Sequence, residues 1–173
     1  MIQNNLLLGL VSIYDKIEEV NQERRLAQVA DKLSNGLPAR VILETTIVQE
    51  DEVYKHSFDE MGRVVSMNDN YYVRFTESEG EEEAATIIKI EPEGVVNITR
   101  HGEQKTRMIF SDQEQTYTNY ITPTGIMEML IETNRLNISY TDHPFAGEIE
   151  VDYVIKLEGY LLGTYQIRLR FTT

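Results

Sequence analysis

The stretch Glu148-Ile149-Glu150-Val151-Asp152-Tyr153-Val154-Ile155-Lys156-Leu157 alternates between polar and apolar side chains over most of its length. A β-strand sends successive side chains to opposite faces, so this alternation predicts a strand with one buried face and one face in water. Similar stretches, each followed by a polar or Gly-containing turn, repeat from Ala84 to Phe171.

The period of two begins at Arg40 and predicts ten strands joined by short connections. The predicted strands are 40–49, 53–66, 70–77, 84–91, 94–100, 105–111, 115–121, 125–140 (bent), 147–158 and 162–172. A flat sheet of this size would expose long edges, which closure removes. We therefore predict a mainly β domain over 38–173, an antiparallel meander closed into a barrel of eight to ten strands.

Residues 1–37 have a helical period instead. One apolar stripe contains Leu6, Leu10, Ile13, Tyr14, Ile17 and Val20, and a second contains Leu26, Val29 and Leu33. The two stripes lie on roughly opposite sides of an ideal helix, so we expect one broken helix or two short ones. Gly36 and Pro38 end this helical appendage.

The charge balance is strongly acidic, with 29 Asp and Glu against 16 Lys and Arg and a net charge of −13. Nucleic-acid binding requires clustered Lys and Arg that replace counterions, and the basic residues here are scattered along the sequence. We therefore expect no nucleic-acid partner and interpret the acidic charge as a solubility feature.

Other compositional features indicate a cytoplasmic protein. The chain has no Cys, which rules out disulfides and thiolate chemistry. No apolar run approaches the roughly 20 residues that span a bilayer. The run Leu6–Val11 lacks the preceding positive charge and the cleavage site of a signal peptide. We expect neither a membrane partner nor a secreted location.

Arg100 interrupts the inward apolar face that Val96 and Ile98 begin. A buried Arg needs an anionic partner, because an unpaired charge in an apolar interior is very costly. Arg100 is therefore either an anchor for an anionic ligand or a residue at the barrel mouth that pairs with one of the many carboxylates. Arg74 has the same two interpretations, with a weaker case for a ligand.

Three methionines and two tyrosines complete the candidate ligand-binding set. Met108, Met127 and Met129 would form a soft, adaptable lining, and Tyr120 and Tyr153 would line a cavity and offer hydroxyl groups. Ordinary core packing is the favoured explanation of the same residues.

The sequence contains no recognisable catalytic or metal-binding pattern. His56, His101 and His143 fall in or near three separate turns, so their spacing gives no support for a metal site. No Gly-x-Ser-x-Gly nucleophile elbow and no Gly-rich phosphate loop occurs. We expect no metal and no cofactor, and an enzyme is the least favoured class.

The order and spacing of several short motifs resemble the YwiB-like family of uncharacterised bacterial β-barrel proteins. The motifs are Tyr72-Val73-Arg74-Phe75-Thr76-Glu77, Thr86-Ile87-Ile88-Lys89-Ile90, Arg100-His101-Gly102, Met108-Ile109-Phe110, Tyr120-Ile121-Thr122-Pro123-Thr124-Gly125, Thr133 and Gly159-Tyr160-Leu161-Leu162-Gly163. The resemblance covers about 40–173 and implies a lipocalin-like (calycin-type) barrel. It implies no activity and no catalytic residues, although Arg74, Arg100 and the Thr122-Pro123 corner match recurrent positions.

Two functions follow from a barrel of this kind. In the first, the interior holds a small amphipathic or anionic ligand with Arg100 as its anchor. In the second, side chains fill the barrel, which acts as a protein-interaction module through the N-terminal helices. An apolar helical stripe that stays exposed would predict self-association. Interior volume discriminates between the two, because ordinary ligand pockets start at about 300 Å³.

Overall fold

The computed structural model describes residues 33–173 except 80–81, 103–104 and 123–124, together with Lys16, Val20, Asn21 and Arg24. Ten strands follow one another in this part of the chain. They are β1 (Leu37–Gln49), β2 (Glu52–Met67), β3 (Asn70–Glu79), β4 (Glu82–Ile90), β5 (Val96–His101), β6 (Lys105–Phe110), β7 (Gln115–Thr122), β8 (Gly125–Asp142), β9 (Phe145–Leu157) and β10 (Tyr160–Thr172). All ten predicted strands are present, with ends displaced by three residues at most.

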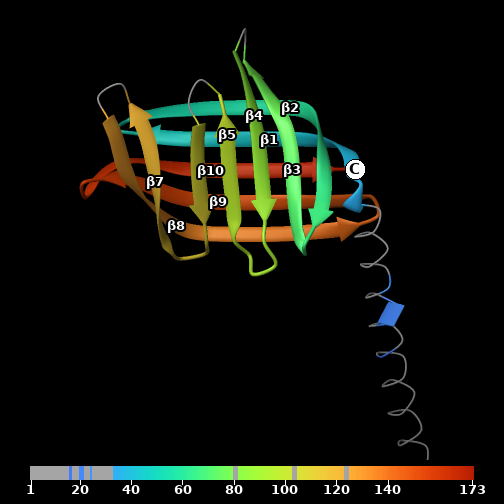
Figure 1. Cartoon of the computed structure of the whole chain (residues 1–173). Helices are drawn as coiled ribbons and strands as arrows, with labels where there is room; N and C mark the ends of the chain where they lie inside the picture. The colour runs from blue at the N-terminus through green and yellow to red at the C-terminus, as the bar shows by residue number, and fades with distance from the viewer. Residues whose placement is uncertain are drawn as a thin grey trace, which may run out of the picture.

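The strands form one antiparallel sheet in the order β6-β5-β4-β3-β2-β1-β10-β9-β8-β7. Sequence neighbours pair throughout, and the pairing of β1 with β10 joins the first strand to the last. The sheet folds over so that β3 to β7 cross the long strands β1, β2 and β8 to β10 at a steep angle (Figure 1). The predicted antiparallel meander is therefore confirmed as a nearly closed ten-stranded barrel of two crossing layers.

The core lies between the two layers and comes from alternate residues of each strand. In β9, Ile149, Val151 and Tyr153 are buried, while Glu148 is exposed and Glu150 and Asp152 are partly exposed, as the alternation predicts. In β3, the inward side chains are Val73 and Phe75. The inward residues of the other strands include Val41, Leu43, Ile88, Ile90, Ile98, Phe110, Ile131, Ile167, Leu169 and Phe171.

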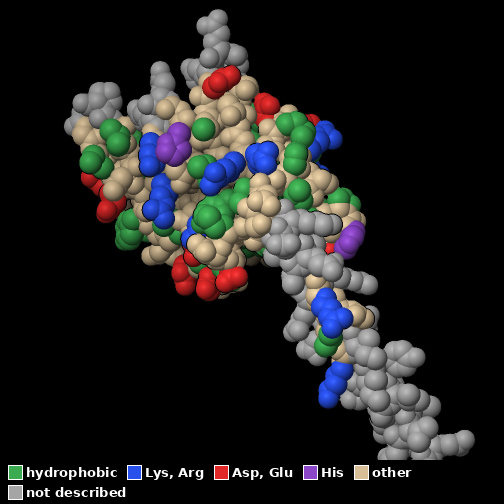
Figure 2. Space-filling model, turned by 45° about the vertical axis from the view of Figure 1, so that its right-hand side comes forward, with side chains coloured by type: hydrophobic (Ala, Val, Ile, Leu, Met, Phe, Trp, Pro, Cys, Tyr) green, Lys and Arg blue, Asp and Glu red, His purple; other side chains and the backbone are tan. Residues whose placement is uncertain are grey.

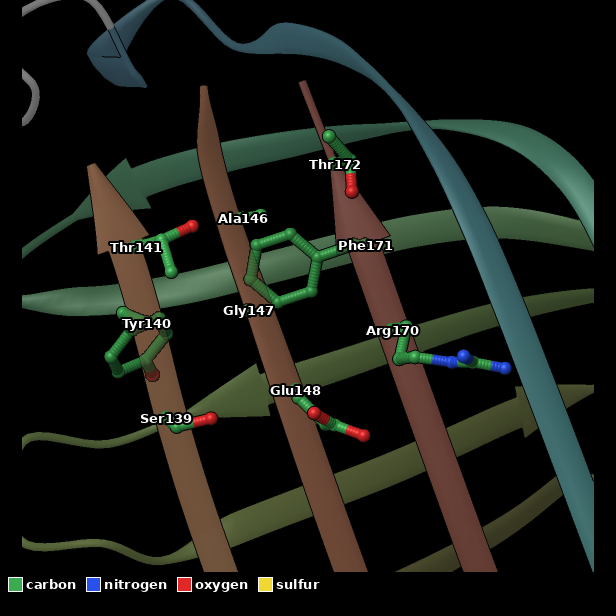
Figure 3. A pocket seen from close by; sticks show the side chains of 9 residues that line it. All are labelled: Ser139, Tyr140, Thr141, Ala146, Gly147, Glu148, Arg170, Phe171 and Thr172. Atoms are coloured by element: carbon green, nitrogen blue, oxygen red, sulfur yellow. The ribbon is translucent and has the colours of Figure 1, made fainter. Parts of the chain in front are cut away.

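Aromatic side chains close one end of the barrel, named here the Phe171 end. Tyr71 lies 5.2 Å from both Tyr140 and Phe145, and Phe145 lies 5.8 Å from Phe171, measured between ring centroids. The ring of Phe171 lies across Gly147 of the neighbouring strand (Figure 3). A Cβ atom at Gly147 would come within 2.3 Å of that ring, so only glycine leaves it room. These rings occupy much of the interior at this end, and a pocket of about 200 Å³ lies beside Tyr140, Gly147 and Phe171 (Figure 3).

The barrel closes between β6 and β7 without a backbone ladder between these strands. Two threonines of β7 donate their hydroxyl protons to β6 instead. The Oγ1 atom of Thr116 lies 2.6 Å from the carbonyl oxygen of Ile109, and that of Thr118 lies 2.6 Å from the carbonyl oxygen of Arg107. Side chains thus supply the hydrogen bonds that main-chain amides supply elsewhere in the sheet.

Strands β2 and β3 separate over half of their length. Their pairing extends only from Arg63–Arg74 to Met67–Asn70, so residues 52–62 of β2 pair with β1 alone. A Cβ atom at Gly62 would lie 2.3 Å from the carbonyl oxygen of Arg74. The absence of a side chain at Gly62 therefore lets β3 approach β2 at the point where the two strands part.

The predicted helical appendage lies largely outside the described residues. Lys16, Val20, Asn21 and Arg24 are helical, as are Leu33 and Ser34. Leu33 is fully buried, and the guanidinium of Arg63 donates a hydrogen bond to the carbonyl of Gly36 at 2.9 Å. Among the described residues, no helix combines the length and the apolar character needed to cross a bilayer.

Candidate functional site

A cavity of about 370 Å³ lies between the two layers, away from the Phe171 end. Its walls come from seven strands of both layers, so it exists only in the assembled barrel. The lining residues are Leu43, Thr45, Ile47, His56, Phe58, Glu77, Ile98, Arg100, Thr106, Met108, Tyr153, Ile155, Tyr165 and Ile167. Most of them are apolar, and the volume falls within the range of ordinary small-molecule pockets.

One wall of the cavity carries a carboxylate and a guanidinium that pair with each other. The Arg100 Nε atom donates to Glu77 Oε2 at 2.7 Å, and the Thr86 hydroxyl donates to Glu77 Oε1 at 2.6 Å. The Glu77 side chain is 7% exposed and that of Arg100 is 44% exposed. Each oxygen of the buried Glu77 carboxylate thus accepts one hydrogen bond, whereas the Arg100 side chain extends toward solvent.

Arg100 keeps part of its donor capacity available. Its bond to Glu77 uses Nε, and neither terminal amino group hydrogen-bonds to another described residue. A guanidinium has five N–H donors, so further acceptors can bind to the same side chain. The Arg100 backbone pairs with Thr86 on one side and Thr106 on the other. These residues make the cavity wall polar at this point, and the opposite charges of Glu77 and Arg100 cancel.

The opposite wall carries stacked aromatic rings. Tyr153 and Tyr165 face each other on β9 and β10, with ring centroids 5.0 Å apart and planes within 16° of parallel. Gln49 donates to the Tyr165 hydroxyl at 3.1 Å. Burial, with a smaller contribution from Tyr165, raises the pKa of Tyr153 well above its ordinary value. Tyr153 therefore stays neutral at physiological pH and presents an apolar ring.

This arrangement suits binding by shape and hydrogen bonding. An apolar body would contact Ile98, Met108 and Ile155, and a polar group would reach Arg100. In the described part of the chain, no group of three His, Asp or Glu side chains is arranged to hold a metal ion. His56 contributes one imidazole to the lining.

Three of the seven predicted ligand-binding residues come together in this cavity. Arg100, Met108 and Tyr153 all line it, although they lie on β5, β6 and β9. Strand alternation accounts for this, because all three side chains point inward from their strands. The alternative in which Arg100 pairs with a carboxylate is present as well, since Glu77 occupies its Nε.

The other four predicted residues lie elsewhere. Arg74 is exposed on the outer face of β3, because Val73 and Phe75 occupy the inner face, so Arg74 does not line the cavity. Tyr120 is 39% exposed on β7. Met127 lines a separate surface groove beside Tyr117 and Lys156. Met129 points inward and packs on the core without reaching the cavity.

Glu77 is the functional residue that the sequence analysis missed. It continues the face of Tyr71, Val73 and Phe75 at the same spacing of two. The alternation in this strand is ambiguous, because the consecutive residues Tyr71 and Tyr72 place an aromatic side chain on each face. The sequence therefore does not decide which face points inward. One feature of the sequence points to Glu77. Glu77 and Arg100 have opposite charges, and both occupy inward positions near the ends of their strands.

A scan against protein-family models matches residues 41–169 to the family described as a domain of unknown function, DUF1934. The chain belongs to the DUF1934 family. Among solved structures, the DUF1934 chain is similar to the ywiB protein from Bacillus subtilis. The TM-score is 0.67 at 16% identity, over 79% of this chain and 92% of that one. At that identity the likeness shows a shared fold. No curated protein matches the DUF1934 chain.

Proposed function

We propose that the protein binds one small amphipathic molecule in the cavity between its two layers. The observation that carries the proposal is the cavity itself, with about 370 Å³ of space beside a buried carboxylate–guanidinium pair. Large inward side chains occupy the Phe171 end, where a pocket of about 200 Å³ remains, and the cavity of about 370 Å³ lies away from that end, beside Glu77 and Arg100. A barrel that served only as a packed scaffold would gain stability by filling this space.

The polar end of the ligand is an acceptor that Arg100 binds through its terminal amino groups. Glu77 already neutralises the charge of Arg100, so an anionic head group gains hydrogen bonds with modest net attraction. Hydrogen bonds to charged groups contribute about 1.5–3 kcal/mol. The apolar body then contacts Ile98, Met108, Ile155 and Ile167.

Two fluorescent probes of different head-group charge test the proposal. Anilinonaphthalene sulfonate is anionic, and Nile red is neutral. We expect both probes to bind wild-type protein and a cavity-filling variant, Thr106→Trp, to weaken both. The double variant Glu77→Gln/Arg100→Met removes both charges together and leaves no buried carboxylate unpaired. It should lower sulfonate affinity about tenfold, which corresponds to about 1.4 kcal/mol, and leave Nile red affinity unchanged.

A matched pair on the outside of the barrel provides the control. Arg170 contacts Glu44 at 3.1 Å, and both side chains are about half exposed. Glu44→Gln/Arg170→Met removes the same charges from the outer face of β1 and β10, which points away from the cavity, and should change neither affinity. Sulfonate binding that survives both Thr106→Trp and the inner double variant would place the probe elsewhere and overturn the proposal. Native mass spectrometry of protein from its own host then identifies the bound molecule.

A further inference from the structure

The outer face of strands β3 to β6 collects basic side chains in an otherwise acidic chain. Arg74 of β3, Lys89 of β4 and Arg107 and Lys105 of β6 all occupy outward positions, and Arg63 of β2 pairs with Arg74. These five residues are named here the basic face. Among the described outward residues of β3 to β6, only Glu83, beside the β3–β4 turn, carries a carboxylate. Figure 2 shows blue side chains spread across the molecule, with red ones toward its margins.

The cations of the basic face differ in their partners from most cations of the other layer, where Lys55 of β2 is the exception without a carboxylate contact among the described residues. Arg40, Arg135, Lys156, Arg168 and Arg170 each contact a carboxylate. Within the described part of the chain, Arg63, Arg74, Lys105 and Arg107 contact none, and Lys89 contacts Glu91 at 2.8 Å. Although the chain has 29 acidic residues, four cations of this face thus contact no carboxylate of the described residues.

Polar side chains lie between these cations. Thr76, Asn97, Thr99 and His101 occupy outward positions of the same strands, and Asn97 donates to the Glu91 carboxylate at 2.9 Å. Asn97 accepts a hydrogen bond from Arg107 at 3.1 Å, which holds that guanidinium on the sheet. The surface therefore offers donors at several points to one extended anion.

Two aromatic rings accompany the cations. The guanidinium of Arg74 lies 5.8 Å from the ring centroid of Tyr72. Tyr117 of β7 is 63% exposed, and its neighbour Thr118 bonds to the carbonyl of Arg107, so this ring borders the basic face. Proteins that bind single-stranded nucleic acid combine cations along the path of the phosphate backbone with exposed aromatic rings on which the bases stack.

We infer that the basic face binds single-stranded nucleic acid. A flat sheet surface matches a flexible strand better than the grooves of a duplex, into which helices or ribbons must insert. An acidic peptide would use the cations but has no need of the exposed Tyr117. The scattered positions of the basic residues in the sequence had argued against such a partner. In space, the period of two and the antiparallel registers bring them together.

The salt dependence of binding follows from the number of cations. Single strands lose affinity with a logarithmic slope of about −0.7 for each phosphate neutralised. Four unpaired cations give a slope of about −2.8, so affinity should fall about 50-fold between 50 and 200 mM salt. A variant that lacks two of them should have a slope of about −1.4.

Fluorescence anisotropy of the full chain with labelled 12-nucleotide oligo-U and oligo-dT tests the inference. Arg74→Ala/Arg107→Ala should weaken binding and halve the salt slope, and Tyr117→Ser should weaken binding without changing the slope. The control is Arg40→Ala/Arg170→Ala, which removes two cations that carboxylates already neutralise. Thermal melts of each variant confirm that the barrel is folded.

Four outcomes would overturn the inference. They are no binding at 50 mM salt, equal losses in the test and control pairs, preference for a duplex of the same length, and competition by poly-glutamate as strong as that by oligo-U. The last outcome would identify an acidic protein segment as the partner.

Discussion

The buried carboxylate of Glu77 receives the Nε–H of Arg100 across the cavity wall at 2.7 Å. Glu77 is nearly inaccessible while Arg100 is 44% exposed, so the two sides of the pair are not equivalent. Removing Arg100 leaves a desolvated carboxylate without its charged partner, whereas removing the Glu77 charge leaves a guanidinium that still reaches water.

We therefore predict that Arg100→Met costs more stability than Glu77→Gln. The first should lower the free energy of unfolding by about 2 kcal/mol and the second by about 1 kcal/mol or less. Adding Glu77→Gln to Arg100→Met should restore most of the loss. Urea denaturation of the four proteins of this double-mutant cycle measures the coupling. Additive effects would show that the two side chains act independently.

Gly147→Ala should destabilise the barrel by about 1–3 kcal/mol, because the new Cβ overlaps the ring of Phe171 and forces it to move. Phe171→Leu should relieve the overlap, so Gly147→Ala should cost less in that background than in wild type. Thermal melts of the single and double variants check this expectation. The matched control is Gly94→Ala, where a Cβ would meet no atom within 4 Å and the cost comes from the positive φ alone.

The seam between β6 and β7 should open more readily when its threonine hydroxyls are removed. Thr116→Val and Thr118→Val each delete a side-chain bond to a β6 carbonyl and should cost about 1 kcal/mol apiece. Hydrogen exchange followed by mass spectrometry should show faster exchange in β6 and β7 than in β1 and β10. Thr164→Val, on the exposed outer face of β10, is the control and should leave exchange unchanged. Uniform acceleration across all strands would indicate global destabilisation instead.

Alkaline pH should reveal the burial of Tyr153. Its pKa is raised in the folded state, so the folded protein holds this proton more tightly than the unfolded chain does. The contribution of Tyr153 to stability is complete below the ordinary tyrosine pKa of about 10 and is lost as pH rises beyond it. The pKa values of Tyr140, Tyr71 and Tyr54 are raised as well. Absorbance at 295 nm should therefore show several tyrosines fewer titrating near pH 10 in folded wild type than after unfolding in urea, and Tyr153→Phe should reduce that deficit by one tyrosine.

Strand alternation made the β fold predictable from the sequence. Each strand has one buried face, so the apolar spacing in β9 or β10 specifies both the strand and the direction of its side chains. The same parity placed Arg100, Met108 and Tyr153 inside correctly. Parity alone does not place Arg74, because β3 has apolar residues on both faces and its inward side depends on packing against the other layer.

The remaining features depend on registers, which a single sequence does not specify. Glu77 and Arg100 are 23 residues apart, and only the pairing of β3 with β4 and of β4 with β5 brings them within one hydrogen bond. The basic face arises in the same way, since Arg74 and Arg107 become neighbours only through the strands between them. The bonds of Thr116 and Thr118 replace a ladder, and hydrophobic periodicity carries no information about them.

The pairing of β1 with β10 has a consequence for how the chain acquires its structure. Nine residues of β1, from Arg40 to Val48, pair with β2 on one edge and find the partners for their other edge in Thr164–Thr172, more than a hundred residues later. During synthesis, β1 can pair with β2 as soon as both have left the ribosome, but its second edge stays open until β10 has been synthesised. The loss of chain entropy on closing so long a loop precedes any gain from the contacts. Closure between the two ends of the chain is therefore expected to be a late and slow step in folding, and the open edge of β1 is the segment most exposed to intermolecular pairing before it occurs.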